Sequence, residues 1–400
     1  MNSVEKWLLP EGVEEILPDE AHVLETFRRG ILDLYRSWGY QLVMTPFVEY
    51  LDSLLVGTSH DLDLHTFKVT DQLSGRMMGI RADMTPQVAR IDAHCLNRNG
   101  PVRLCYADSV LHTRPRGLLT SRVPFRVGAE LFGHAGVEAD VELICLMLET
   151  LRLADIRNIH LVLGHVGIFR TLVAEARLDE DVEATLFDLV QRKAYAEIDS
   201  LLQAAVDNSK LRQMLYHVTR LSGDAETLDH ALQVFADAPA AVRSELAELE
   251  AIASGVNRQA ADVTLCFDLC ELRGYEYHTG IVFAAYTPEN GRAVAKGGRY
   301  DDIGEVFGRA RPASGFDCDL KVLSRLTHKT FRRPSGILAP MTTDTELPKL
   351  ISELRGAGET VIVNFSSDQP GVDDGIELGC DRYLTRQSGK WVVKEFAQDQ

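Results

Sequence analysis

Residues 273–283 read Arg-Gly-Tyr-Glu-Tyr-His-Thr-Gly-Ile-Val-Phe, which places a guanidinium, aromatic hydroxyls and an imidazole beside an apolar run. Gly274 and Gly280 permit close approach of the backbone to a ligand, and the residues after them have the composition of a buried strand. Arg273 precedes this strand, where its fork of N–H donors could bind a ligand carboxylate. The stretch predicts one wall of a pocket that includes Tyr277, although His278 taken alone could also be a structural histidine.

Two carboxylates earlier in the chain could belong to the same pocket. Glu130 lies in an apolar segment between alanine and leucine, where an unpaired carboxylate would be costly, so it requires a ligand or a protein arginine as its partner. Asp83 could receive an ammonium group, but Asp83-Met-Thr85 before Pro86 is also the pattern of a helix N-cap. The sequence leaves both alternatives open for both acids.

A loop rich in arginine, proline and glycine contains Arg114 and Arg116, and Arg122 and Arg126 follow it closely. These side chains could bind an anion, or they could pair with the carboxylates of this acidic protein. The chain carries 59 acidic and 42 basic residues, for a formal charge of −17, which disfavours binding to a polyphosphate backbone such as tRNA.

Hydrophobic periodicity predicts the elements that position these residues. An amphipathic helix over 20–37 precedes a short strand that Pro46 closes, and later a second helix is expected over 137–153. The other predicted elements are strands at 40–46, 102–106, 123–132, 159–163 and 279–283 and a helix at 317–326.

A change in composition divides the chain further. Residues 167–258 are almost purely helical in pattern and rich in Ala, Leu, Glu and Asp, which predicts a helical insertion. Residues 332–336 have the composition of a linker. We therefore expect one α+β domain over 1–330 that contains the insertion, and a small α/β domain over 331–400 with a strand at 360–365 and a hairpin turning at 388–389.

The composition predicts a cytoplasmic protein. The seven cysteines form no C-x-x-C pair and lie mostly in apolar runs, as buried reduced thiols do. The N-terminal residues show neither a signal peptide nor a transit peptide, and no apolar run approaches the ~18 residues that span a bilayer. We expect no cofactor, no metal and no membrane partner.

Several motifs, in collinear order over residues 10–326, resemble histidyl-tRNA synthetases, which are class II aminoacyl-tRNA synthetases. The motifs are Arg81–Thr85, Tyr106–Glu130, Val127–Gly133, Arg273–Phe283, Gly297–Asp301 and Pro312–Leu323. The resemblance implies an α+β fold on an antiparallel sheet with flanking helices. It also implies an amino-acid pocket of Asp83, Thr85, Arg126, Glu130, Arg273, Tyr277 and His278, with a possible anion site at Arg114 and Arg116.

The departures from that family concern the nucleotide. The two arginines that bind ATP in such enzymes fall on His112 and Val322, and Asp317 and Asp319 add negative charge nearby. Each charge-assisted bond to a phosphate contributes ~1.5–3 kcal/mol, so losing two removes ~3–6 kcal/mol, or roughly a hundred- to ten-thousand-fold in affinity. Adenylate formation is therefore not expected.

This combination is similar to the synthetase-like regulatory subunit of ATP phosphoribosyltransferase. The resemblance implies a non-catalytic chain that activates a short-form catalytic subunit and helps confer feedback inhibition by histidine in the first step of histidine biosynthesis. It also implies a homodimer, formed through residues 20–50, within a hetero-octamer. The alternatives are an active histidyl-tRNA synthetase and a stand-alone amino-acid-binding paralogue.

Overall fold

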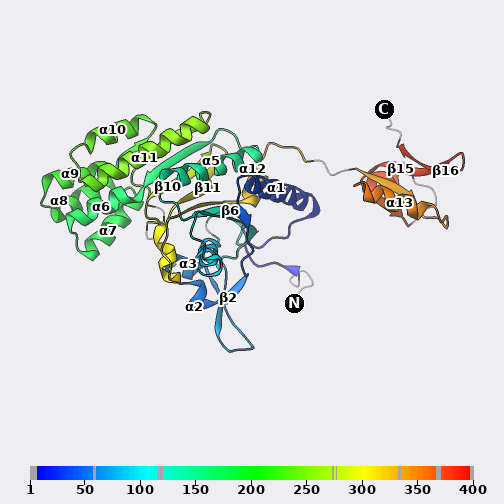
Figure 1. Cartoon of the computed structure of the whole chain (residues 1–400), viewed down its shortest axis with the longest axis horizontal. Helices are drawn as coiled ribbons and strands as arrows, with labels where there is room; N and C mark the ends of the chain where they lie inside the picture. Colours follow the sequence, from blue (N-terminus) through cyan, green and yellow to red (C-terminus); the bar gives the residue numbers. More distant parts are fainter. Residues whose placement is uncertain are drawn as a thin grey trace. The chain divides into compact units, whose positions relative to one another are not determined.

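The computed structural model describes residues 7–56, 60–115, 117, 120–272, 274–275, 277–331, 335–365 and 371–396 (Figure 1). The chain divides into two units, Met1–Lys329 and Thr330–Gln400. In the described part of the chain, no helix is long and apolar enough to cross a membrane.

The first unit is built on a nine-stranded sheet in the order β1-β5-β6-β12-β11-β10-β7-β9-β8. The strands are β1 (Gln41–Leu42), β5 (Val102–Ser109), β6 (Phe125–Phe132), β7 (His160–His165), β8 (Ser222–Gly223), β9 (Thr264–Asp268), β10 (Ile281–Thr287), β11 (Asn290–Arg299) and β12 (Ala313–Asp319). Every pair from β5 to β7 is antiparallel, whereas β1 and β9 join their neighbours β5 and β7 in parallel. The predicted antiparallel α+β fold is confirmed.

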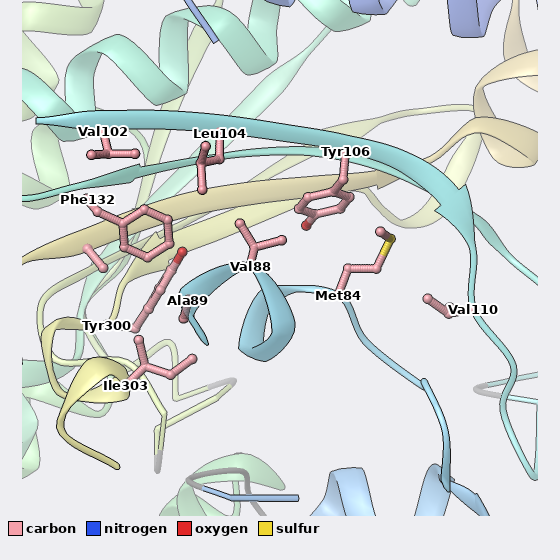
Figure 2. Packing of buried hydrophobic residues seen from close by; sticks show 11 residues of the cluster. Met84, Val88, Ala89, Val102, Leu104, Tyr106, Val110, Phe132, Tyr300 and Ile303 are labelled. Atoms are coloured by element: carbon pink, nitrogen blue, oxygen red, sulfur yellow. The ribbon is translucent and has the colours of Figure 1, made fainter. Parts of the chain in front are cut away.

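Helices cover both faces of this sheet. On one face lie α1 (Pro18–Ser37), α5 (Val137–Leu153) and α12 (Leu320–Leu326), which Figure 1 shows side by side. On the other face, α4 (Thr85–Arg90) directs Val88 and Ala89 toward Leu104 and Phe132 of the sheet (Figure 2). Because side chains alternate along a strand, the residues of β5 and β6 that face α4 are separate from those that face α1 and α5.

A three-stranded antiparallel sheet of β2 (Val48–Tyr50), β4 (Met77–Ile80) and β3 (Phe67–Thr70) contacts the short helix α2 (Leu51–Leu54), and α3 (His60–His65) precedes β3 in the chain. A π-helical segment, η2 (Ile91–Leu96), continues α4, and a 3₁₀ segment, η3 (Asp301–Phe307), follows β11.

Helices fill most of the chain between β7 and β9. They are α6 (Val166–Ala176), α7 (Glu180–Gln191), α8 (Tyr195–Ala205), α9 (Ser209–Val218), α10 (Glu226–Val234) and α11 (Ala240–Gln259), and we call them the helical insertion. Figure 1 shows most of them gathered at the end of the sheet away from α1.

The second unit has a four-stranded sheet in the order β14-β13-β15-β16. Its elements are β13 (Gly336–Pro340), α13 (Leu347–Gly356), β14 (Val361–Asn364), α14 (Val372–Glu377), β15 (Cys380–Gln387) and β16 (Lys390–Glu395). Ser388 and Gly389 form the predicted hairpin turn with positive φ. Ile337, Leu347 and Leu384 belong to its core.

Two element predictions need correction. The helix expected over 317–326 begins only at Leu320, because Asp317 and Asp319 belong to β12 and the Asp319 carboxylate accepts the N–H of Lys321 at the helix start. The strand expected over 40–46 is reduced to Gln41–Leu42, because pairing with β5 involves only these residues and Val43 adds one further bond to the carbonyl of Cys105.

Candidate functional site

A cavity of about 260 Å³ opens on the α4 face of the large sheet. Its walls come from the residues just before and within α4, from β6, β10, β11 and β12, and from Glu271, Gly274, Tyr277 and His278, which precede β10. We call the described residues Gly274, Tyr275, Tyr277 and His278 the pocket turn, of which Tyr275 does not line the cavity. Strand register explains the floor, since Glu130 pairs with Gly315 on β12 and Asp317 pairs with Lys296 on β11.

Glu130 lines the cavity and is only 1% exposed. Its Oε1 accepts hydrogen bonds from the hydroxyls of Thr85 at 3.0 Å and Tyr106 at 3.2 Å, and the hydroxyl of Tyr300 donates to Oε2. Burial raises the pKa of Glu130 to about 8, against the lowering effect of the Tyr300 and Thr85 hydrogen bonds. The partners found in the described residues are hydroxyls and not the protein arginine considered from sequence.

Glycines make room for this carboxylate. A Cβ at Gly315 would overlap Oε2 of Glu130 and would lie 2.9 Å from the Tyr300 hydroxyl. A Cβ at Gly128 would lie 2.5 Å from the hydroxyl of Tyr106, one of the donors to Glu130. Glycine at these positions therefore leaves room for the carboxylate of Glu130 and for the ring of its donor Tyr106.

Asp83 and Thr85 form the rim of the cavity next to α4. Asp83 Oδ1 accepts the backbone N–H of Thr85 at 3.0 Å, while the residue that caps α4 is Met84, which makes no side-chain cap bond. Asp83 therefore satisfies an N–H group at the helix start and also lines the cavity, so the two alternatives considered from sequence are compatible.

The pocket turn supplies the opposite wall. The ring of Tyr277 stacks on Tyr300 with centroids 5.0 Å apart and meets His278 edge-on at 5.3 Å. The Tyr277 hydroxyl is buried without a hydrogen-bond partner among the described residues, and burial raises its pKa well above the ordinary value. A neutral phenol left in this way is suited to bond with a ligand in the cavity.

Arg126 does not line the cavity but supports a residue that does. Its Nη1 donates to Asp317 Oδ1 at 3.4 Å, and the carboxylate of Asp319 lies across the β6–β12 pair from it. Burial lowers the pKa of Arg126, but Asp317, Asp319 and Asp83 raise it by more, so the guanidinium stays charged. Arg126 therefore pairs with a carboxylate of the protein itself, which is one of the two alternatives considered from sequence.

The other predicted basic residues lie elsewhere. Arg114 is exposed on its loop and does not line the cavity, while Arg116 and Arg273 lie outside the described residues. Arg122 donates to the backbone carbonyls of Glu11 and His112. The possible anion site at Arg114 and Arg116 therefore stays a prediction.

Sequence reasoning missed Tyr300, Lys296 and Glu271 as parts of the cavity wall. Tyr300 belongs to the Gly297–Asp301 motif and bonds to Glu130. The neighbouring Arg299 does have a structural role, because its Nη2 donates to the buried Asp140 of α5 at 2.5 Å. The alternation of β11 could have placed Lys296 on the same face as Gly298, but the choice of face needs the strand register.

The two positions that carry nucleotide-binding arginines in synthetases do not face the cavity. His112 is 2% exposed, and its Nε2 lies 3.0 Å from the carbonyl oxygen of Ala82. Val322 is half-buried on α12.

Comparison with known proteins supports a single family. A family profile described as histidyl-tRNA synthetase matches residues 12–323, and one described as the C-terminal domain of the ATP phosphoribosyltransferase subunit HisZ matches residues 334–394. The ATP phosphoribosyltransferase regulatory subunit of Thioalkalivibrio sulfidiphilus is 54% identical over 99% of this chain and 100% of its own length. The protein of the same name from Alkalilimnicola ehrlichii is 54% identical over 97% of both chains.

Solved structures agree with this result. A protein from Bacillus halodurans described as an ATP phosphoribosyltransferase regulatory subunit/histidyl-tRNA synthetase superposes with a TM-score of 0.81 at 25% identity, covering 94% of this chain and 96% of the other. Histidyl-tRNA synthetase from Nostoc superposes with a TM-score of 0.76 at 19% identity over 97% of both chains, which shows a shared fold. With full-length relatives above 50% identity and both family profiles in order, the chain belongs to the ATP phosphoribosyltransferase regulatory subunits.

Proposed function

We propose that this regulatory subunit is catalytically inactive and that it activates a short-form ATP phosphoribosyltransferase while contributing to feedback inhibition by histidine. The full-length relatives with this name support the regulatory role. The observation that carries the inactive state is the position of His112, which lies buried against the Ala82 carbonyl where a synthetase has a guanidinium for the α-phosphate. An imidazole in contact with a carbonyl oxygen lacks the five N–H donors of a guanidinium, so it does not replace the synthetase arginine at a phosphate.

The cavity remains suited to an amino acid. Asp83 and Glu130 offer carboxyl groups, and the Tyr277 hydroxyl, which has no hydrogen-bond partner among the described residues, offers a neutral donor and acceptor. Thr85 and His278 complete the set that lines the cavity, with Arg126 behind Asp317 and Arg273 at the start of the pocket turn's sequence. We propose histidine as the ligand, in line with the effector of the pathway, and a cytoplasmic homodimer within a hetero-octamer that binds neither tRNA nor cofactor.

Three measurements test this proposal. Purified chain should show no ATP–pyrophosphate exchange in the presence of histidine, and it should co-purify with a short-form catalytic subunit. Histidine-dependent exchange or charging of tRNA would contradict the inactive state and restore the synthetase alternative. Titration with all twenty amino acids separates histidine from other ligands, because binding of a different amino acid alone would identify a stand-alone paralogue.

A further inference from the structure

An arginine of the helical insertion forms hydrogen bonds with the backbone of the pocket turn. Arg170 lies on α6, and its Nη2 donates to the carbonyl oxygens of Tyr275 at 2.6 Å and of His278 at 3.0 Å. The two acceptors are the backbone on either side of Tyr277, whose ring forms a wall of the cavity. A charged donor with two backbone acceptors is a strong contact, and it fixes the turn against the insertion.

The side chain of Tyr275 makes a second contact between the pocket turn and the helical insertion. Its ring lies 5.9 Å from Phe169 of α6 and 5.2 Å from Phe187 of α7, and the Arg170 guanidinium stands 4.9 Å above it. Aromatic pairs and a cation–π contact of this kind stabilise a side chain in one orientation. The side chain of Tyr275 is therefore packed into the insertion, while Tyr277 and His278, two and three residues later, line the cavity.

The backbone of the pocket turn is tightly constrained between the contacts with the insertion and the residues that line the cavity. Gly274 has φ of +71°, and its carbonyl accepts the backbone N–H groups of both Tyr277 and His278 at 2.8 Å. A Cβ at Gly274 would lie 2.6 Å from Nδ1 of His278, so the turn is closely wound. A shift of Tyr275 with the insertion would consequently move Tyr277 and His278.

We infer that the contact of Arg170 and Tyr275 couples the helical insertion to the cavity, with Arg170 as a positioning residue for the ligand. This inference rests on the proposed function of the cavity as an amino-acid site. A ligand that bonds to Tyr277 binds molecules in which Arg170 holds the pocket turn in place. Its apparent affinity is therefore proportional to the fraction of molecules in which this contact is formed. Coupling of this kind acts in both directions, so the bound ligand stabilises the contact of α6 and α7 with the pocket turn. A partner that moves these helices consequently changes the affinity of the cavity for the ligand.

The test compares three full-length proteins by calorimetric titration with histidine and by amide hydrogen exchange. Arg170→Met keeps the aliphatic length of the side chain but removes both donors. Arg220→Met is the matched control, because Arg220 also stands over tyrosine rings, 3.7 Å from Tyr216, and donates to the carbonyl of Tyr195, but within the insertion alone. Loss of two charge-assisted bonds is expected to weaken histidine binding about tenfold or more in Arg170→Met.

The expected exchange pattern is faster exchange in the pocket turn of Arg170→Met and no such change in Arg220→Met. Histidine should slow exchange in α6 and α7 of the unchanged protein but not in Arg170→Met. Arg170→Lys, which keeps a charged donor without the fork, should show intermediate affinity and serves if the methionine variant does not fold. Equal affinity in Arg170→Met and the unchanged protein would overturn the coupling alone, whereas failure of the unchanged protein to bind histidine would overturn the pocket assignment and the coupling with it.

Discussion

Replacement of Glu130 by glutamine tests the electrostatics of the cavity most fully. Glu130→Gln removes the ionisable group while keeping a side chain of the same shape that can bond with the hydroxyls of Thr85, Tyr106 and Tyr300. Burial raises the pKa of Glu130 from its ordinary value of 4.5 to about 8 in the folded protein. Between these values the folded chain holds a proton that the unfolded chain has lost.

The sign of the effect on stability follows from that proton. The contribution of Glu130 to the free energy of unfolding is fully present below pH 4.5 and is lost as the pH rises through about 8. The slope is about 1.4 kcal/mol per pH unit, so the total over the roughly 3.5 units between pH 4.5 and about 8 is roughly 5 kcal/mol. Glu130→Gln has no such slope, so its stability relative to the unchanged protein should increase with pH.

The assay is urea unfolding of both proteins at about pH 5.5, 6.5 and 7.5. Glu175→Gln, at an exposed carboxylate of α6, gives the baseline for a carboxylate outside the cavity. The difference in unfolding free energy between Glu130→Gln and the unchanged protein should grow by about 1.4 kcal/mol per pH unit. A difference that stays constant over this interval would refute a protonated, buried Glu130.

Two further substitutions test the framework of the site. Gly315→Ala adds a Cβ that overlaps Oε2 of Glu130, so it should displace Glu130 and abolish amino-acid binding in calorimetric titration. Gly291→Ala is the control and should bind normally, because its Cβ would meet nothing within 4 Å. Amino-acid binding by Gly315→Ala would contradict this packing. Asp140→Asn removes the buried carboxylate that pairs with Arg299 and leaves it only the longer contact with Asp301, so it should lower the unfolding free energy by about 3–5 kcal/mol. Asp155→Asn, in a partly exposed pair with Arg157, should lower it by less than about 1 kcal/mol. Similar losses for both variants in urea unfolding would show that the Asp140–Arg299 pair has no special weight.

Elements with long apolar periods could be predicted closely from the sequence. The helix expected over 137–153 is α5 with the same bounds, and the helix expected over 20–37 is α1, which begins two residues earlier at Pro18. Strand 123–132 is β6, starting at Phe125. The buried residues of α1 recur at three- or four-residue spacing, so its period is visible without knowledge of its neighbours. In contrast, α5 and β6 are buried on more than one face, and the sequence shows them as long apolar runs.

The site could be predicted only where a residue is unusual for its own segment. Glu130 is a carboxylate in an apolar strand, and its predicted need for partners is met by three hydroxyls from other elements. The sequence could not say that these partners are hydroxyls, because Thr85, Tyr106 and Tyr300 meet only through sheet register and the placement of α4. The contact of Arg170 with the pocket turn spans 105 residues, so no local pattern could indicate it.

We expect this synthetase-like chain to regulate a phosphoribosyltransferase and not to activate an amino acid. The most direct measurement is the rate at which a short-form catalytic subunit transfers the phosphoribosyl group to ATP as the full chain is titrated in, with and without histidine. The account predicts that the rate rises to a plateau at a fixed ratio of subunits and falls when histidine is added. A rate that does not respond to the chain would contradict it.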